Sequence, residues 1–510
     1  MNKKLKIISI LLILLLIGFQ YSIVLDGQKS LPSQNWSRSF TTNVSPGNYA
    51  TIKSIPTKNG YATSLLDLDK MDFLTCTDEL QCNQVWSNSE LNPYKNTWSD
   101  GENTYFIQED SLIHSTSSGE ITIAENVENF AKSDETLMYW LKDQQVVIQQ
   151  DGKESISYTV ENQVNTGMIV DEQIFIVTQN TRDNEFMVLD GNNGLKELFK
   201  FHLNSRENLS SITFSSDGNS QYRLLLDTGI NSGGEMTKII RSVSFDLTIN
   251  QTPELTELAF TDKESGAELF NIRSPFLYKG QTGLTTIMFS AYMYNEFGQK
   301  VNKIFVGNYT QSPIEVSAVT KKGDFYINPT MLNDQTIAYF SLNGSEKELM
   351  YSSSTDEKIA ESKTVLPGDF KEAFYSLITL LFVGLILLLL SFTWLVPGLG
   401  IGFGTLALLQ KLRKPYAFPV SLYANTLALV ITQLVLFATV LHPEKIVLKA
   451  PYLTEVWHVF FVVILSGIGC ILPVLLSRTK VTDDNCNILI LYTTGLNLFI
   501  LFLLLGPYFI

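Results

Sequence analysis

The stretch SDGENTYFIQEDSLIHSTSSGEITIA (Ser99–Ala124) contains the pattern that decides the fold of the polar part of this chain. An Asp100–Gly101 turn leads into a strand in which Tyr105 and Ile107 alternate with other residues, and a second turn leads into further strand-like residues. About 25 residues of this kind form a β-meander, which is too small to bury an apolar face by itself. The stretch is therefore predicted to be one unit of a larger sheet structure.

The same turn-then-strand pattern recurs along the chain. Clear copies begin at Asp134, Asp171, Asp217 and Asp334, and weaker copies lie near Gly60 and Gln281. Second hairpin signals follow some of them, at Asp151–Gly152, Asn193–Gly194 and Asn343–Gly344. Asp-Gly and Asn-Gly pairs suit type I′ turns, because both central residues need positive φ. The copies recur at an average interval of about 46 residues, which is the length of one blade in a repeat sheet protein.

Repeating all-strand units of this length predict an all-β propeller of about seven blades over residues 45–365. The motif Ser216-Asp217-Gly218 resembles the repeats of TolB-like and WD-repeat propellers, and the resemblance covers roughly 320 residues. A closed propeller brings its two terminal strands together in one blade, so we expect the ends of the domain to be joined. An irregular pair of β-sandwiches is the alternative, but sandwiches rarely repeat one turn so often.

Charge and hydropathy divide the 510-residue chain into two parts. Residues 26–370 are polar and contain 26 Lys and Arg against 46 Asp and Glu, whereas the remainder contains 11 against 5. The polar part is therefore strongly acidic. This balance argues against nucleic acid or anionic lipid as its main ligand, because both require a basic surface. Cations, basic peptides and uncharged partners remain open.

Residues 1–25 begin with three lysines and continue as an apolar run from Ile7 to Phe19 that extends to Leu25. A small-residue cleavage site is missing, so we predict an uncleaved transmembrane signal anchor rather than a cleaved signal peptide. Both alternatives place the following domain, residues 26–370, outside the cytoplasm.

Residues 374–409 are an uninterrupted apolar run, too long for one straight membrane span. We expect the run to break at PGLGIGFG (Pro397–Gly404), which gives a span at 374–396 and an interfacial segment near 397–414. A hairpin that returns outside is the alternative. The basic residues Lys411, Arg413 and Lys414 favour the single span, because basic loops stay in the cytoplasm.

Three further spans are predicted at about 419–441, 454–477 and 487–508, so residues 374–510 form a four-span bundle. With the N-terminal anchor, the chain has one N-terminal and four C-terminal transmembrane helices. The N-terminus is predicted to be cytoplasmic, and the large domain and the C-terminus lie outside a plasma (cell) membrane. The bilayer is thus the first predicted partner.

The sequence offers few candidate sites. Glu455 and His458 share a helix face, and His442 precedes them in the outer loop, so the three are weak candidates for metal binding or proton transfer. A polar helix end is the preferred interpretation. Cys76 and Cys82 bracket a short hairpin and are predicted to form a disulfide, because the domain is exported.

The remaining motifs argue against catalysis. HExxH and GxSxG motifs are missing, so we predict that the protein is not an enzyme and needs no cofactor. Polar residues inside the spans are predicted to face one another and hold the bundle together: Asn425, Gln433, Thr493 and Asn497. A charged residue in mid-membrane is lacking, which argues against an ion-coupled transporter.

These features predict an integral membrane protein that displays an external β-propeller as a protein- or peptide-binding module. Its expected partners are an extracytoplasmic protein or peptide and a second membrane protein docked on the helical bundle, with no nucleic acid. Two alternatives stay open: an accessory subunit of a transport or export system, and a membrane-associated enzyme that uses the polar groups at the outer face of the bundle.

Overall fold

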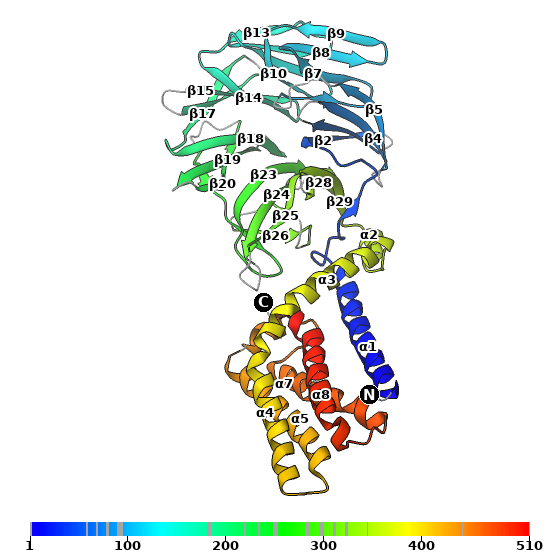
Figure 1. The fold of residues 1–510 in the computed structure, drawn as a ribbon. Helices are drawn as coiled ribbons and strands as arrows, with labels where there is room; N and C mark the ends of the chain where they lie inside the picture. The colour runs from blue at the N-terminus through cyan, green and yellow to red at the C-terminus, as the bar shows by residue number, and fades with distance from the viewer. Residues whose placement is uncertain are drawn as a thin grey trace. The chain divides into compact units, whose positions relative to one another are not determined.

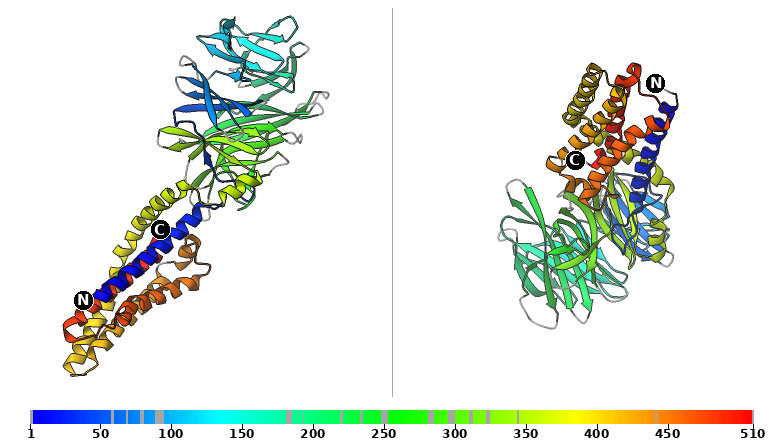
Figure 2. Two further views of the ribbon diagram at one scale, coloured as in Figure 1. Left: turned by 90° about the vertical axis from the view of Figure 1, so that its right-hand side faces the viewer. Right: turned by 90° about the horizontal axis from the view of Figure 1, so that it is seen from below.

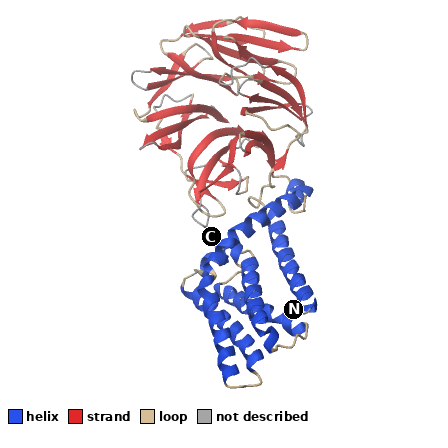
Figure 3. Ribbon diagram, in the orientation of Figure 1, coloured by secondary structure: helices blue, strands red, loops and turns tan. Residues whose placement is uncertain are grey.

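The structure is a computed structural model that forms two compact units, a β-rich unit of Leu31–Lys363 and a helical unit of Met1–Ser30 with Thr364–Ile510 (Figure 1). The strands and helices segregate almost completely between the two units (Figure 3). The structure describes residues 3–508 apart from 58–59, 68–69, 78–80, 89–94, 181–184, 193, 219–220, 233–234, 248–252, 281–284, 295–299, 310–312, 322–324, 344 and 441.

The β-rich unit is a propeller of seven sheets, six with four strands and one with five. This confirms the predicted fold class and excludes the pair of sandwiches. The strands of the first four blades follow the chain order. Blade 1 is β2 (Tyr49–Thr57), β3 (Gly60–Asp67), β4 (Met71–Cys76) and β5 (Cys82–Asn88). Blade 2 is β6 (Trp98–Ser99), β7 (Thr104–Gln108), β8 (Ser111–Thr116) and β9 (Gly119–Ala124), so the stretch Ser99–Ala124 spans almost the whole of this blade.

Blades 3 and 4 have the same antiparallel order. Blade 3 is β10 (Val127–Lys132), β11 (Thr136–Leu141), β12 (Gln145–Gln150) and β13 (Ile156–Thr159). Blade 4 is β14 (Gln163–Val170), β15 (Gln173–Asn180), β16 (Glu185–Asp190) and β17 (Lys196–His202). Buried and more exposed residues alternate along strands such as β12 and β17, as expected for sheets stacked face to face.

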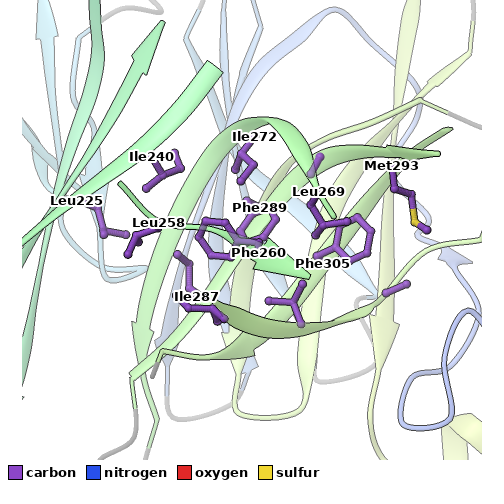
Figure 4. Close-up of a cluster of buried hydrophobic side chains, with 14 of the residues drawn as sticks. Leu225, Ile240, Leu258, Phe260, Leu269, Ile272, Ile287, Phe289, Met293 and Phe305 are labelled. Carbon is purple, nitrogen blue, oxygen red and sulfur yellow. The ribbon is translucent and has the colours of Figure 1, made fainter. Parts of the chain in front are cut away.

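Blades 5 and 6 have longer strands. Blade 5 is β18 (Glu207–Gly218), β19 (Gln221–Ser232), β20 (Glu235–Asp246) and β21 (Thr256–Glu257). Blade 6 is β23 (Phe270–Lys279), β24 (Thr285–Tyr294), β25 (Lys300–Asn308) and β26 (Ile314–Ala318), and β22 (Phe260–Asp262) adds a parallel edge strand beside β26. Buried aliphatic and aromatic side chains from β19, β20, β22, β24 and β25 form a continuous core between these blades (Figure 4).

Blade 7 combines both ends of the domain. Its strands are β27 (Phe325–Asn333), β28 (Thr336–Asn343), β29 (Glu346–Ser353) and the N-terminal β1 (Phe40–Thr41). Phe40 pairs with Tyr351 in the ladder, and their rings stack at 5.5 Å between centroids. The expectation that the terminal strands meet is therefore confirmed. A short helix, α2 (Asp356–Ser362), follows β29.

The helical unit contains α1 (Lys3–Gln28), α3 (Pro367–Leu390), α4 (Phe392–Lys411), α5 (Ala417–Thr439), α6 (Pro443–Lys449), α7 (Val456–Leu476), α8 (Asp483–Leu504) and the 3-10 turn η1 (Gly506–Tyr508) (Figure 2). Five described helices, α1, α4, α5, α7 and α8, are long and apolar enough to cross a membrane. The number agrees with the predicted one N-terminal and four C-terminal spans, but the first predicted C-terminal span, 374–396, falls on α3 and the start of α4, and the candidate span is α4 instead. α1 packs against α3, and the Tyr21 hydroxyl donates to the Phe370 carbonyl at 3.1 Å.

The predicted helix break at Pro397–Gly404 is wrong. The apolar run divides at Ser391 instead, and α4 continues through Pro397 to Lys411. The segment expected at the interface near 397–414 therefore lies largely in a helix that could itself span. Pro397 lies inside α4, in its second turn, and removes one backbone hydrogen bond, which membrane helices tolerate.

The glycines of this stretch pack helices together rather than breaking one. The buried residues of α4 recur every four positions, at Trp394, Gly398, Gly402 and Leu406. A Cβ on Gly398 would lie 2.3 Å from Leu429 of α5, and one on Gly402 would lie 2.8 Å from the Cβ of Asn425. The absence of side chains at these two positions lets the α4 and α5 backbones approach, as small residues do in membrane bundles.

The polar residues of the spans form a buried network, as predicted. Asn425 Nδ2 donates to Thr494 Oγ1 at 3.0 Å, and Gln433 Nε2 donates to Asn497 Oδ1 at 2.6 Å. Asn497 Nδ2 in turn donates to Ser466 Oγ at 3.0 Å. The network links α5, α7 and α8 through groups that hydrocarbon would otherwise leave unsatisfied. Thr493 instead donates to the carbonyls of Leu489 and Ile490 in its own helix.

Candidate partner-binding face of the propeller

The recurring turns of the sequence lie at one end of the propeller. Each joins the first strand of a blade to the second, and the first strands of blades 3 to 7 contact one another in turn, as do those of blades 7 and 1. Asp100, Asp134, Asp171 and Asp334 lie in or beside these turns, between β6 and β7, β10 and β11, β14 and β15, and β27 and β28. The weak copy near Gln281 and the Asp217 side chain lie outside the described residues. We call the described residues of these turns the turn rim.

The Asp100 turn shows why acidic residues occupy the rim. Asp100 Oδ1 accepts the backbone N–H groups of Glu102 at 2.9 Å and Asn103 at 2.7 Å, and Gly101 has a φ of +99°. Burial would raise the pKa of Asp100, but these hydrogen bonds outweigh burial and the pKa lies below its ordinary value. The carboxylate thus both closes the turn and stays charged near neutral pH.

Side chains of the rim join neighbouring blades. The Glu172 carboxylate accepts the hydroxyls of Ser133 at 3.1 Å and Thr136 at 2.9 Å, which connects blades 3 and 4. Lys279, at the end of β23, pairs with Asp171 at 2.7 Å and lies 3.5 Å from Ser216 Oγ. Burial alone would raise the pKa of Asp171, but the hydrogen bonds from Lys279 and Ser216 lower it below its ordinary value.

Blades 6, 7 and 1 are joined in the same way. The Tyr278 hydroxyl hydrogen-bonds to Asp334, and burial together with this carboxylate raises the pKa of Tyr278 to about 12. Asn333 donates to the Tyr61 hydroxyl. The described turns of blades 3 to 7 and blade 1 are therefore linked by side-chain contacts rather than forming independent loops.

Carboxylates dominate the charge of the turn rim. They belong to Asp100, Glu102, Asp134, Glu135, Asp171, Glu172 and Asp334. The described basic groups beside them are Lys132 and Lys279, at the ends of β10 and β23. Asp134, Glu135, Glu172 and Asp334 are exposed. A face of this kind attracts cationic groups and repels anionic ones.

An aromatic pair holds one of the two lysines. Lys132 Nζ lies 4.9 Å from the ring centroid of Trp98 and 5.6 Å from that of Tyr105. His114 stacks on Tyr105 at 4.4 Å, and its Nε2 lies 3.0 Å from Asn103 Oδ1. His114 is a partly exposed residue of β8.

The structure joins Cys76 and Cys82 by a disulfide across the β4–β5 hairpin of blade 1. Cys470 and Cys486 are buried in the helical unit and are free. The disulfide closes the hairpin between the third and fourth strands of its blade. In an antiparallel blade this hairpin lies at the same end as the turn between the first and second strands, so the disulfide lies at the end of the turn rim.

The three candidate groups of the helical unit are not brought together as a metal site. Glu455 and His458 form a reciprocal capping box at the start of α7, and Trp457 Nε1 donates to Glu455. His442 lies 3.3 Å from Glu444, and both are exposed. Within the described part of the chain, three or more His, Cys, Asp or Glu side chains do not gather in a group that could hold a metal ion. Capping explains why Glu455 and His458 stand at this helix end.

Sequence reasoning found the acidic turns but missed their partners. Lys279 is 108 residues away from Asp171 in the chain. It precedes the weak copy of the turn pattern near Gln281, and no local sequence pattern indicated that it would pair with Asp171. The repeat period was the signal that placed both residues at the same end of their blades.

The chain has no match among protein-family models and none among curated proteins. Solved structures align with it at low identity. The N-terminal domain of Nup159 aligns at 11% identity with a TM-score of 0.39, covering 63% of this chain and 96% of that one. BBS1N, solved in complex with ARL6DN, aligns at 10% identity and a TM-score of 0.40, covering 63% and 97%.

A third structure, the Penicillium chrysogenum alpha-L-arabinanase complexed with arabinobiose, aligns at 12% identity with a TM-score of 0.34 and covers 62% of this chain and 99% of that one.

Proposed function

We propose that this protein is a multi-pass plasma-membrane protein whose external propeller binds an exported, positively charged protein or peptide. The observation that carries the proposal is the convergence of the blade turns into one rigid, acidic rim. An excess of carboxylates on a preformed surface accelerates encounters with cationic partners and discriminates against anionic ones. Under this proposal the propeller binds and does not catalyse.

The proposed topology places the N-terminus in the cytoplasm, and the propeller and the C-terminus outside. Lys411, Arg413 and Lys414 support this orientation, because the loop between α4 and α5 is basic. Arg478 and Lys480 do the same for the loop between α7 and α8. The short cytoplasmic loops leave any further signalling or energy-consuming step to a second membrane protein docked on the helices, which is part of the proposal.

The test is a charge reversal on the rim with a matched control. In the D134K/E135K variant of the full-length protein, two exposed rim carboxylates become lysines. In the control E125K/E161K, the same charge change is made at exposed residues between blades, away from these turns. Exported proteins captured in mild detergent are quantified by mass spectrometry at low and at high salt.

We expect basic proteins that are captured by the wild type and released by salt to be lost from D134K/E135K and retained by the control. Equal capture by both variants would contradict the proposed rim. Capture of proteins that are not basic would contradict the proposed partner class.

The triple alanine variant of Glu455, His458 and His442 should leave capture unchanged, whereas a loss of capture would favour a role for the outer face of the helical bundle.

A further inference from the structure

A cavity lies between blades 6 and 7, on the side of the turn rim. It has a volume of about 550 Å³, within the range of small-molecule sites. A second cavity of about 660 Å³ adjoins it and shares Asn35, Lys263 and Ser317 in its lining. The turn residue Asp334 and residues next to the β25–β26 turn line the first cavity, which fixes its place in the fold.

The lining is polar, which indicates a polar ligand. Amide and hydroxyl side chains of the first cavity belong to Asn35, Thr286, Asn308, Ser317 and Ser354. Ser33 lines the second cavity, is only 4% exposed, and its Oγ has no hydrogen-bond partner among the described atoms. A buried hydroxyl without a partner costs free energy that a ligand group would recover.

The charges of the lining favour a cation. Glu315 and Asp334 line the first cavity, Glu264 lines the second, and Lys263 is shared. Neither Glu315 nor Lys263 has a salt-bridge partner within the part of the chain that the structure describes. The Asp334 carboxylate lies against Gly280, where an added Cβ would be 2.9 Å from its Oδ1. The absence of a side chain at Gly280 thus leaves room for the Asp334 carboxylate.

An apolar strip completes the lining, formed by Val306, Pro313 and Met331. Such a strip suits the methylene stem of a side chain or polyamine, while the carboxylates suit its charged end. We propose that this cavity binds an ammonium or guanidinium group carried on an aliphatic stem. The group belongs either to a free small molecule, such as a polyamine, or to a lysine or arginine side chain of an exported protein.

The site has a consequence for the rest of the chain. Asn35 and Trp36 belong to the segment that follows α1, and Ser354 precedes α2. The first residues of the propeller unit and the residue that follows β29 therefore line one cavity. A bound cation contacts both and reduces their local opening, which hydrogen exchange measures.

The test uses the full-length protein in detergent and isothermal titration with three probes. Spermidine represents a free polyamine, N-acetyl-arginine methylamide represents an arginine side chain, and N-acetyl-glutamate methylamide is the acidic control. We expect at least one cationic probe to bind, with affinity reduced by about tenfold or more in E315Q and in D334N, because each variant removes a charged hydrogen-bond acceptor. K263M should bind the cation more tightly, and E120Q, at an exposed carboxylate on β9, should bind like the wild type.

Binding of spermidine alone assigns the site to a free polyamine, and binding of the capped arginine alone assigns it to a protein side chain. The proposal is overturned if neither cation binds, if E315Q and D334N bind as the wild type does, or if the acidic probe binds best. Slower exchange of residues 31–36 on binding is the second expected readout. If D334N fails to fold, E315Q alone decides, because Glu315 is exposed.

The outcome is independent of the proposed protein partner. Glu315 lies on β26, outside the turn rim, and D134K/E135K leaves the cavity lining intact. A failed capture experiment with intact cation binding would reject the acidic rim and keep the cavity.

Discussion

Lys53 is a single residue of the propeller that makes its stability depend on pH. It lies on β2, and its Nζ donates to Asn96 Oδ1 at 3.3 Å. Burial lowers the pKa of this lysine from 10.5 to about 8. Below pH 8 the side chain is charged in both the folded and the unfolded chain, so the cost of burying the charge is fully present. Between pH 8 and 10.5 the folded protein releases a proton that the unfolded chain retains, and the stability rises with pH.

K53M should therefore stabilise the propeller by about 1–2 kcal/mol at pH 7, because the variant removes a partly buried charge that water still screens in part. The rise in stability between pH 8 and 10.5 should become smaller than in the wild type. Denaturant unfolding of the full-length protein, followed by tryptophan fluorescence at several pH values, measures both effects. K153M, at an exposed lysine, is the control and should keep the wild-type pH profile. A K53M profile parallel to that of the wild type would contradict the assignment.

Polar residues that must find a hydrogen-bond partner inside an apolar helix were predictable from the sequence. Asn425, Gln433 and Asn497 lie in apolar helices, where an amide without a partner is costly, so they were expected to meet, and each of them lies in the observed network. The pairing of Asp171 with Lys279 was not predictable in this way. Both residues are at the surface, where water is an equally good partner, and only the relative placement of blades 4 and 6 brings them together.

At the scale of elements, the glycines of α4 make the sharpest test. A Cβ on Gly402 meets Asn425 Cβ, an atom that cannot move without moving the α5 backbone. G402A should therefore push α4 and α5 apart and destabilise the bundle by about 1–3 kcal/mol. Gly404 is on the same helix and has open space around it, so G404A should be neutral or slightly stabilising.

Thermal unfolding of both variants in detergent measures this difference. Equal melting temperatures for G402A and G404A would mean that the packing of Gly398 and Gly402 does not set the α4–α5 distance.

The same glycines explain why the helix break was predicted at the wrong residues. Pro and Gly have low helix propensity in water, but a spacing of four residues between Gly398 and Gly402 is also the pattern of close helix packing. Propensity alone does not separate these two cases.

The closing strand β1 is the second element-scale test. It is short, and Phe40 is 8% exposed and stacked on Tyr351, whereas Thr41 points to solvent. F40A should destabilise the propeller by about 3 kcal/mol, because a buried aromatic side chain is removed from the blade that joins the two ends of the ring. T41A, on the same strand, should cost much less. Denaturant unfolding compares the two, and similar losses would show that β1 does not depend on the Phe40 contact.

At the scale of the whole molecule, the repeats predicted the propeller because every blade encodes its own turn. An Asp-Gly pair or an Asp in a tight turn acts within a few residues, and repeated copies at an average interval of about 46 residues leave few all-β alternatives. Four of the five apolar helices, α1, α5, α7 and α8, were predictable for the same local reason, whereas most of α4 was assigned to an interfacial segment. The cavity between blades 6 and 7 was not, since its lining comes from positions between 35 and 354 that no local pattern relates.

The topology is the last prediction, and it depends on the α4–α5 pair. The two helices contact along the glycine face and are joined by the short basic segment 412–416, so the segment before α4 and the segment after α5 must lie on the opposite side of the bilayer from this loop. In a full-length variant without native cysteines, E444C should react with a membrane-impermeant maleimide in intact cells, and L412C should react only after permeabilisation. Leu412 and Glu444 are both exposed, so access to the reagent rather than burial controls labelling. Reaction of L412C in intact cells, with E444C protected, would mean that residues 374–409 cross the bilayer twice as a hairpin, and it would reverse the sides of the loops that follow α4, α5 and α7.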